Sequence, residues 1–352
     1  MAIPYLKTTL DCADFDKTVL PYVYQFYDLP EKALGVLQGR QSPLAFYTTT
    51  NPLVFGLGLS LALAPVFLVV SEWHRNYSWV DRFWSLIPTL YNAHYALYAH
   101  ATGIPTGRID LVFLASAIWS TRLTFNYWRR GGYSRGSEDY RWEILQKTIK
   151  PRIVWFLFNV TFISTIQMIL LFAVTVPSYA LLLSSKVTKT PEAVDYVFAS
   201  TLVGFVALTA LADQQQQNYY NARDKYRANK SVTSGYLAQD LERGFNSTGL
   251  FAYSRHPNFA FEQSVWLTLF FWAGTVCESY RTWIAIAPIA YLGLFQASAA
   301  FSEGVTSSKY PDYPIYQKRV SYMVPLPRSK IDWVKERAHL GIGEGKKDKK
   351  EL

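Results

Sequence analysis

Apolar residues of this 352-residue chain gather in long blocks that polar segments separate. Hydrophobic types make up 50% of the residues and charged types 17%, so the charge falls between the blocks. The length of each block approaches the roughly 20 residues that a helix needs to cross a bilayer. We therefore expect an all-α fold, a multispan integral membrane helical bundle of about seven transmembrane helices, over Pro52–Ser71, Phe83–His100, Asp110–Trp128, Ile153–Val176, Tyr196–Ala212, Ser264–Cys277 and Trp283–Phe301.

The distribution of Lys and Arg predicts which side of the membrane each polar segment faces. Residues 129–152 hold seven basic residues, residues 213–262 hold six, and the segment after Glu303 holds eleven. The opposite segments together hold four basic residues, in 101–109, 177–195 and 278–282. Because positively charged loops stay in the cytosol, the C-terminus is predicted to be cytosolic.

Three segments follow from this topology: a non-cytosolic N-terminal segment (1–51), a membrane-embedded domain (52–327) and a cytosolic basic tail (328–352). The chain ends in KKEL, where Lys349 and Lys350 match the dilysine pattern that retrieval coats bind on endoplasmic-reticulum membrane proteins. This pattern predicts an endoplasmic-reticulum location. The alternative is a solubilising basic tail whose ending matches by chance.

Several classes of function are not predicted. Cys12 and Cys277 are too few for a disulfide framework, and we expect two free thiols. The histidines show no spacing that places two on one helix face as metal ligands. The positive net charge of +9 is explained by the cytosolic loops, so nucleic-acid binding has no separate support.

The segment RHPN begins the sixth apolar block with an unusual set of polar groups. Pro257 disfavours a helical conformation at His256 and suits the first turn of a helix. Arg255, His256 and the helix N-terminus would then form a site for a phosphate or carboxylate. Glu262 follows Asn258 by four residues and shares its helix face. The alternative is that Arg255 and His256 lie among lipid headgroups.

A second polar run follows the fifth apolar block. Asp213 lies four residues before Gln217 and five before Asn218, and Arg223 lies five residues after Asn218, so one helix face would carry them toward the same pocket. Their donors and acceptors suit a ribose and an amide. A solvated helix end is the alternative interpretation.

The stretches GLFAYSRHPNFAFEQ and SEGVTSSKYPDYPIYQKRVSYMVPLP resemble the C-terminal domain of the steroid 5-alpha-reductase superfamily, nearest to its uncharacterised membrane branch, a domain of unknown function. VDRFWS, STRLTFNYWRRGGYSRGSEDYRWE and ADQQQQNYY extend the resemblance from Trp79 to Pro327. Members of the superfamily are multispan membrane enzymes. Its reductases hold NADPH in a cytosolic-side cavity and transfer hydride to a conjugated double bond.

The resemblance therefore implies a membrane-bound, NADPH-dependent reductase of a lipid or steroid-like substrate, a hydrophobic small molecule. It implies cofactor contacts at Asp213, Arg223, Arg255, His256, Asn258, Tyr313 and Tyr316. Reduction of an enone also needs a group that polarises or protonates the carbonyl oxygen. The candidates for this catalytic role are Glu262, Tyr253 and Glu303.

Two further functions fit the same residues. The RHP stretch, with a later Glu and a pair of tyrosines, also resembles isoprenylcysteine carboxyl methyltransferase and related phospholipid methyltransferases, which bind S-adenosylmethionine. A non-enzymatic membrane protein that keeps the fold and binds lipid is the third possibility. Saturable binding of NADPH, of S-adenosylmethionine or of neither separates the three.

Overall fold

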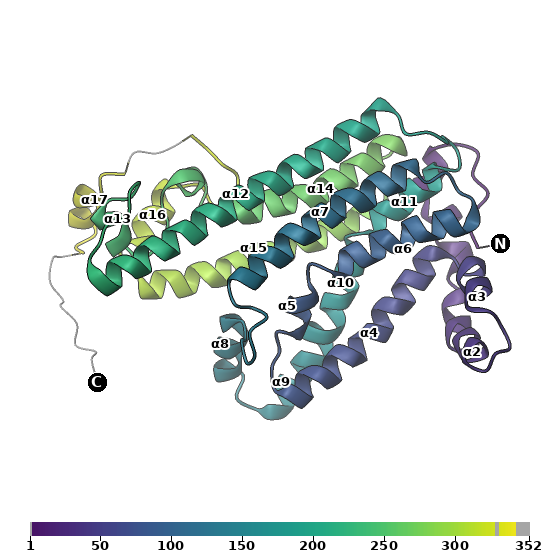
Figure 1. Cartoon of the computed structure of the whole chain (residues 1–352), viewed down its shortest axis with the longest axis horizontal. Coiled ribbons are helices and arrows are strands. Elements are labelled where there is room, and N and C mark those ends of the chain that lie inside the picture. The colour runs from purple at the N-terminus through teal and green to yellow at the C-terminus, as the bar shows by residue number, and fades with distance from the viewer. Residues whose placement is uncertain (1, 328–330, 343–352) are drawn as a thin grey trace. The chain divides into compact units, whose positions relative to one another are not determined.

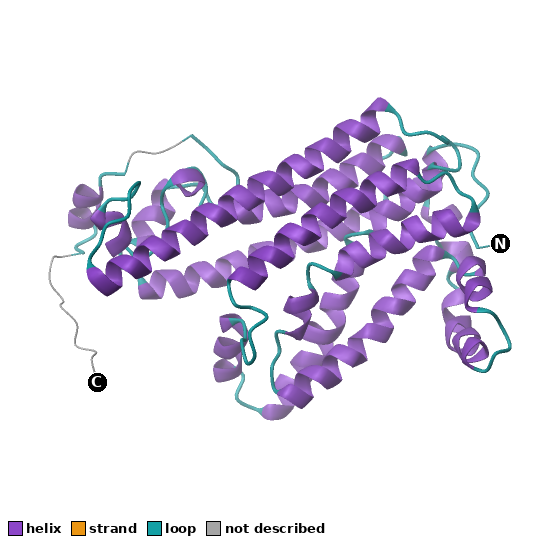
Figure 2. Cartoon of the chain, in the orientation of Figure 1, coloured by secondary structure: helices purple, strands orange, loops and turns teal. Residues whose placement is uncertain are grey.

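The computed structural model describes residues 2–327 and 331–342, and these residues form helices and no strands (Figures 1 and 2). The N-terminal part contains η1 (Leu10–Ala13), α1 (Phe15–Thr18), η2 (Leu20–Tyr22), α2 (Gln25–Leu37), α3 (Pro43–Thr49), α4 (Pro52–His74), α5 (Trp79–Phe83), α6 (Ile87–Thr102), α7 (Gly107–Arg129) and α8 (Tyr140–Thr148). The remainder contains α9 (Arg152–Phe158), the π-helical segment η3 (Asn159–Ile166), α10 (Gln167–Ala173), α11 (Val176–Ser184), α12 (Ala193–Asn229), α13 (Ala238–Glu242), η4 (Gly249–Ala252), α14 (Pro257–Val276), η5 (Trp283–Ala285), α15 (Ile286–Lys309), α16 (Tyr313–Arg319) and α17 (Trp333–His339).

Four helical segments of the described residues are long and apolar enough to cross a membrane: Pro52–His74, Arg152–Ser184, Ala193–Asn229 and Trp283–Lys309. Each overlaps one of the seven predicted spans, as expected of a helical membrane protein. The other three predicted spans correspond to α6, α7 and α14, which are helices but do not meet the same criterion. They stay predictions, as does the full seven-span topology.

The chain divides into two compact units. Unit 1 comprises 1–206 and 265–291, and unit 2 comprises 207–264 and 292–352. This division differs from the three consecutive segments predicted above, which stay a prediction. The predicted tail holds one described helix, α17, whereas its KKEL ending lies outside the described residues.

Unit 1 shows how local sequence sets the helix ends. The Asn51 side chain caps α4 by accepting from Leu53 N and Val54 N, and Pro52 occupies the first turn. Gly103 ends α6 with a φ of 72°, a conformation that favours glycine, and α6 then packs beside α7 (Figure 1). Local chemistry thus defines where the spans of this unit begin and end.

A buried ion pair lies inside unit 1. Arg108 Nε and Nη2 donate to Asp195 at 2.8 and 3.0 Å, and Trp272 Nε1 donates to the same carboxylate at 2.7 Å. Charges this deeply buried are tolerated because their hydrogen-bonding groups are satisfied. Cys12 and Cys277 are free and buried, as expected.

Unit 2 is organised around an aromatic cluster. Phe245, Tyr313, Tyr316 and Val320 are buried together, with further apolar side chains from Tyr310, Ile331 and Trp333. Gly244 precedes the cluster with a φ of 86°, and a Cβ there would lie 2.2 Å from the Tyr310 ring. Glycine is therefore required at this turn.

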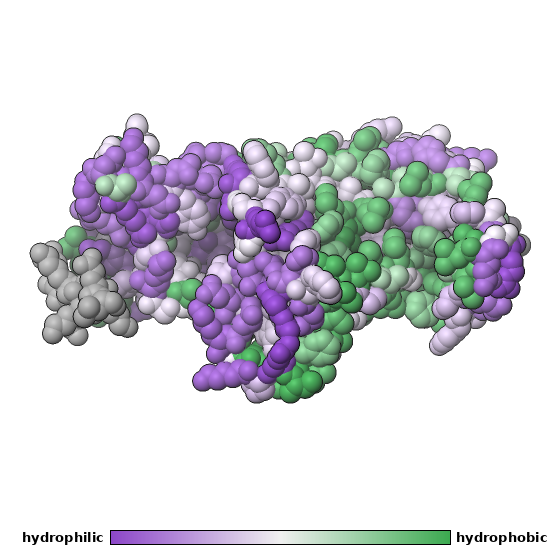
Figure 3. Space-filling view, turned by 60° about the horizontal axis from the view of Figure 1, so that its bottom comes forward, coloured by the Kyte–Doolittle hydropathy of each residue, from purple (hydrophilic) through white to green (hydrophobic). Residues whose placement is uncertain are grey.

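Hydrophobic and hydrophilic residues occupy separate patches of the face drawn in Figure 3, rather than mixing evenly over it. A contiguous apolar surface of this kind is typical of a membrane or partner contact. Together with the four apolar helical segments, it indicates a membrane-embedded protein that contacts the lipid bilayer.

Candidate functional site

The RHPN segment lies in unit 2, where α14 begins at Pro257 as the sequence predicts. Backbone bonds hold the residues just before it. Arg255 N donates to Ser321 O at 2.8 Å, and Leu326 N donates to Tyr253 O at 3.0 Å. The chain from Tyr253 to Arg255 is therefore fixed against the segment that follows α16.

Glu303, near the end of α15, is the centre of the site. Its Oε1 accepts from Arg255 Nε at 2.6 Å, His256 Nε2 at 3.0 Å and Tyr313 OH at 3.3 Å. Its Oε2 accepts from Arg255 Nη2 at 3.2 Å and Gln317 Nε2 at 2.8 Å. A carboxylate offers about four lone-pair positions, so these donors fill its capacity. In this arrangement Glu303 accepts hydrogen bonds and does not donate.

The Arg255 guanidinium is also almost fully used. Besides its two bonds to Glu303, its Nη1 donates to Gln317 O at 2.8 Å and to Val320 O at 2.6 Å. The Arg255 side chain is 11% exposed and that of Glu303 is 9% exposed. Four of the five guanidinium N–H groups therefore serve the protein, which leaves one for a ligand.

His256 is held in a defined tautomer. Because the Glu303 carboxylate can only accept, the proton of this contact resides on His256 Nε2. The ring stacks on Phe259 with centroids 5.6 Å apart and meets the Tyr322 ring edge-on at 5.4 Å. These contacts fix the plane of the imidazole.

Two tyrosines of α16 face the same network. Tyr313 donates to Glu303, and Tyr316 donates to the carbonyl of Phe251 in η4. Burial raises the pKa of Tyr313 and of Tyr316 above the ordinary value for a phenol, so both stay protonated donors near neutral pH.

A second contact joins α12 to the start of α14. Asn258 Nδ2 lies 3.5 Å from Asp213 Oδ1, at the limit of a hydrogen bond, and Asp213 is buried. Glu262 is buried one turn further along α14, on the face that the sequence predicts from its four-residue spacing. The structure thus places a buried acid on each of two neighbouring helices.

The other α12 candidates contact residues of their own helix, and Arg223 also contacts the turn at Gly244. Gln217 Nε2 donates to Asn221 Oδ1 at 2.9 Å, and Asn218 Oδ1 accepts from Gln214 Nε2 at 2.7 Å. Arg223 donates to Asp224 at 2.9 Å and to the Gly244 carbonyl at 3.3 Å. The cofactor roles of Gln217, Asn218 and Arg223 stay predictions.

Tyr253 differs from the other catalytic candidates, since this residue is 42% exposed.

Sequence reasoning missed Gln317 and Tyr322, which complete the site around Glu303 and His256. Both lie in the stretch YQKRVSYM, next to the quoted tyrosine pair, and their polar and aromatic character within that stretch was the available signal.

No group of three or more His, Cys, Asp or Glu residues in the described part of the chain is arranged to hold a metal ion. The chemistry on offer is therefore a fixed array of donors, carboxylates and one imidazole.

Comparisons with known proteins show which family the chain resembles. A family model described as "Protein of unknown function (DUF1295)" matches residues 67–320, which include every catalytic and cofactor candidate named above. An uncharacterized protein of Schizosaccharomyces pombe is 37% identical over 341 residues, covering 96% of this chain and 97% of the yeast protein. No solved structure matches significantly.

Proposed function

The chain belongs to the DUF1295 family, and we propose that it is a membrane-bound reductase that uses NADPH to reduce a conjugated double bond in a lipid or steroid-like substrate. The observation that carries the proposal is that Arg255 and His256 of the RHPN segment and Tyr313 of α16 all bind Glu303, in one hydrogen-bonded network within unit 2. The resemblance to the steroid 5-alpha-reductase superfamily implies such a meeting. The seven-span topology, the cytosolic C-terminus and the endoplasmic-reticulum location belong to the same proposal.

Side chains of unit 2 offer the kinds of donors and acceptors that a dinucleotide needs. Asp213 and Asn258 offer a carboxylate and an amide for a ribose, and Arg223 offers a guanidinium for a phosphate. Among the described residues, Gln216 Oε1 and Asn246 Nδ2 are buried in this unit without a hydrogen-bond partner, and a bound amide or hydroxyl would satisfy them. When bound, NADPH would supply the hydride.

The roles of the protein groups follow from their contacts. Glu303 orients Arg255 and His256 and is better suited to positioning than to proton donation, because its oxygens already accept five hydrogen bonds. His256 presents Nδ1 on a ring whose orientation is fixed. Glu262 and Tyr253 stay candidates for the group that polarises or protonates the substrate carbonyl.

Cofactor titration of the purified protein in detergent tests the proposal. We expect saturable NADPH binding and oxidation of NADPH when a conjugated lipid enone is added. Asp213→Asn should lower NADPH affinity about ten- to a hundredfold, since a hydrogen bond to a charged group contributes about 1.5 to 3 kcal/mol. Asp16→Asn, an exposed change in α1, is the matched control and should leave affinity unchanged.

The alternatives are separate outcomes of the same titration. Binding of S-adenosylmethionine without any binding of NADPH would replace the reductase with a methyltransferase. Binding of neither, in protein that keeps its thermal transition, would favour a non-enzymatic lipid-binding protein. Equal NADPH affinity in Asp213→Asn and in the control would remove α12 from the cofactor site.

A further inference from the structure

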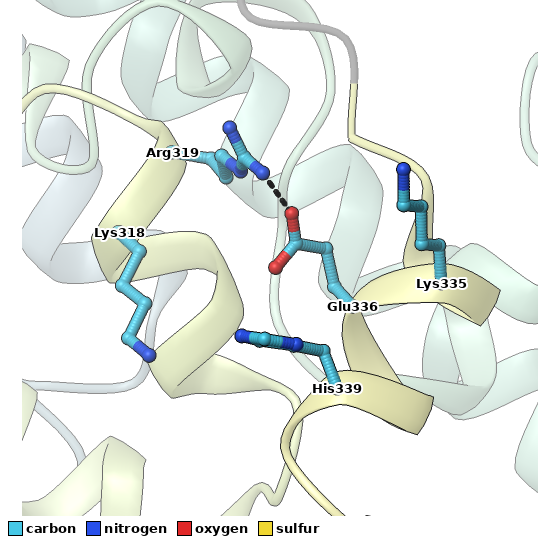
Figure 4. Close-up of a pocket in the computed structure, with 5 residues that line it drawn as sticks. All are labelled: Lys318, Arg319, Lys335, Glu336 and His339. Carbon is cyan, nitrogen blue, oxygen red and sulfur yellow. Dashed lines mark hydrogen bonds and ion pairs between the residues drawn. The ribbon is translucent and has the colours of Figure 1, made fainter.

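An open cleft of about 670 Å³ lies between α16 and α17 in unit 2. It is lined by Lys318, Arg319, Lys335, Glu336 and His339, so four of its five lining side chains carry nitrogen donors (Figure 4). None of these residues belongs to the network around Glu303 described above. The cleft is a separate, strongly basic feature.

The two helices that form the cleft are fastened together. Arg319 of α16 pairs with Glu336 of α17, and Arg337 Nε donates to Asp312 at 2.8 Å beside the start of α16. Trp333 packs against the aromatic cluster of unit 2. The cleft is therefore a fixed feature of the fold.

The charge in the cleft is only partly neutralised. Glu336 is paired with Arg319, whereas neither Lys318 nor Lys335 has an ion-pair partner among the described residues. Figure 4 shows the Lys318 ammonium and the His339 ring pointing toward a common space, with Lys335 on the other side of Glu336. The cleft thus presents a net positive charge to any anion that enters.

The helix dipole does not cancel this attraction. The cleft lies at the C-terminal end of α16, where unpaired carbonyls would repel an anion. The carbonyls of Gln317 and Val320 at this end already accept from the Arg255 guanidinium. These two carbonyls are therefore already paired, although the Arg255 charge itself is balanced by Glu303.

The surroundings of the cleft identify the anion. The candidate span Trp283–Lys309 ends four residues before α16 begins, and Val334, beside Lys335, is 77% exposed. Val324 and Leu326, between α16 and α17, are exposed as well. Exposed apolar side chains next to basic ones are typical of surfaces that lie against anionic lipids. We propose that this cleft binds a phosphate group, carried by an anionic lipid at the membrane surface.

Native mass spectrometry of the full chain in detergent tests the proposal by counting bound phosphatidic acid against phosphatidylcholine. The test variant is Lys318→Gln with Lys335→Gln. Each basic residue near a membrane surface contributes about 1 kcal/mol, so the pair should lose roughly thirtyfold in affinity for phosphatidic acid. The charge-matched control, Lys225→Gln with Arg227→Gln, changes two exposed residues of α12 and should keep wild-type affinity.

A parallel arm distinguishes the two sources of phosphate. Equilibrium dialysis with radiolabelled inorganic phosphate and no lipid should show little binding if the lipid headgroup is the ligand. Saturable phosphate binding that the Lys318 and Lys335 changes abolish would support the same cleft with a soluble ligand. The proposal is overturned if the double variant keeps its affinity for both ligands, or if the control loses as much as the test variant. Lys318→Arg with Lys335→Arg should retain binding, which separates charge from folding.

Discussion

Replacing Arg255 by alanine provides the sharpest test of the site geometry. The change removes two hydrogen bonds from Glu303 and leaves the carbonyls of Gln317 and Val320 without their donor. Arg255 and Glu303 are both about nine-tenths buried. Removing one partner of a buried ion pair costs about 3 to 5 kcal/mol, because the other charge stays buried. We therefore expect Arg255→Ala to destabilise unit 2.

The assay is the thermal transition of the purified protein in detergent. A loss of this size should lower the transition by on the order of 10 °C. Arg255→Lys should recover part of the lost stability, because lysine keeps the positive charge. Its single ammonium lacks the planar guanidinium group, so it cannot donate to Glu303 and to both carbonyls at once. The control is Arg227→Ala, an exposed change in α12, which should alter stability by no more than about 0.5 kcal/mol.

The same variants separate a positioning role from a cofactor contact. Four of the five N–H groups of Arg255 are bound within the protein. Removing the Arg255 side chain should therefore lower the stability, and NADPH affinity should fall only in protein that is also destabilised. A folded Arg255→Ala protein with an unchanged thermal transition would refute this reasoning. If that protein had also lost NADPH binding, Arg255 would be a direct phosphate ligand, as the sequence alone predicts.

Two other predictions follow from glycosylation sequons and from a glycine turn. The Asn229 and Asn246 sequons should remain without glycan, because both are predicted to be cytosolic. Asn229 is the more informative of the two, since it is exposed whereas Asn246 is buried. A glycan on Asn229, detected in a mobility-shift assay, would reverse the predicted topology. Gly244→Ala should destabilise the protein by about 1 to 3 kcal/mol through strain and contact with Tyr310. Gly235→Ala, at a φ of 90° with open space around it, should cost less in the same thermal assay, and equal losses would contradict the contact.

Local features were predictable from the sequence because they depend on neighbouring residues. The apolar blocks gave four segments that the structure confirms as long, apolar helices. Pro257 marked the start of α14, since proline suits a first helical turn. The four-residue spacing of Asn258 and Glu262 gave their common helix face.

Only the tertiary structure assigned partners to these side chains. Sequence reasoning treated Glu303 as a possible proton donor and Arg255 as a phosphate ligand, although the two lie 48 residues apart and form one ion pair. It also missed Gln317, whose amide and carbonyl both enter the network. Partners separated in this way meet through the packing of α14, α15 and α16, and helix periodicity does not encode that packing. The sequence therefore determined which polar groups lie at the ends of apolar helices, whereas the folded chain decided which of their hydrogen-bonding groups are already occupied.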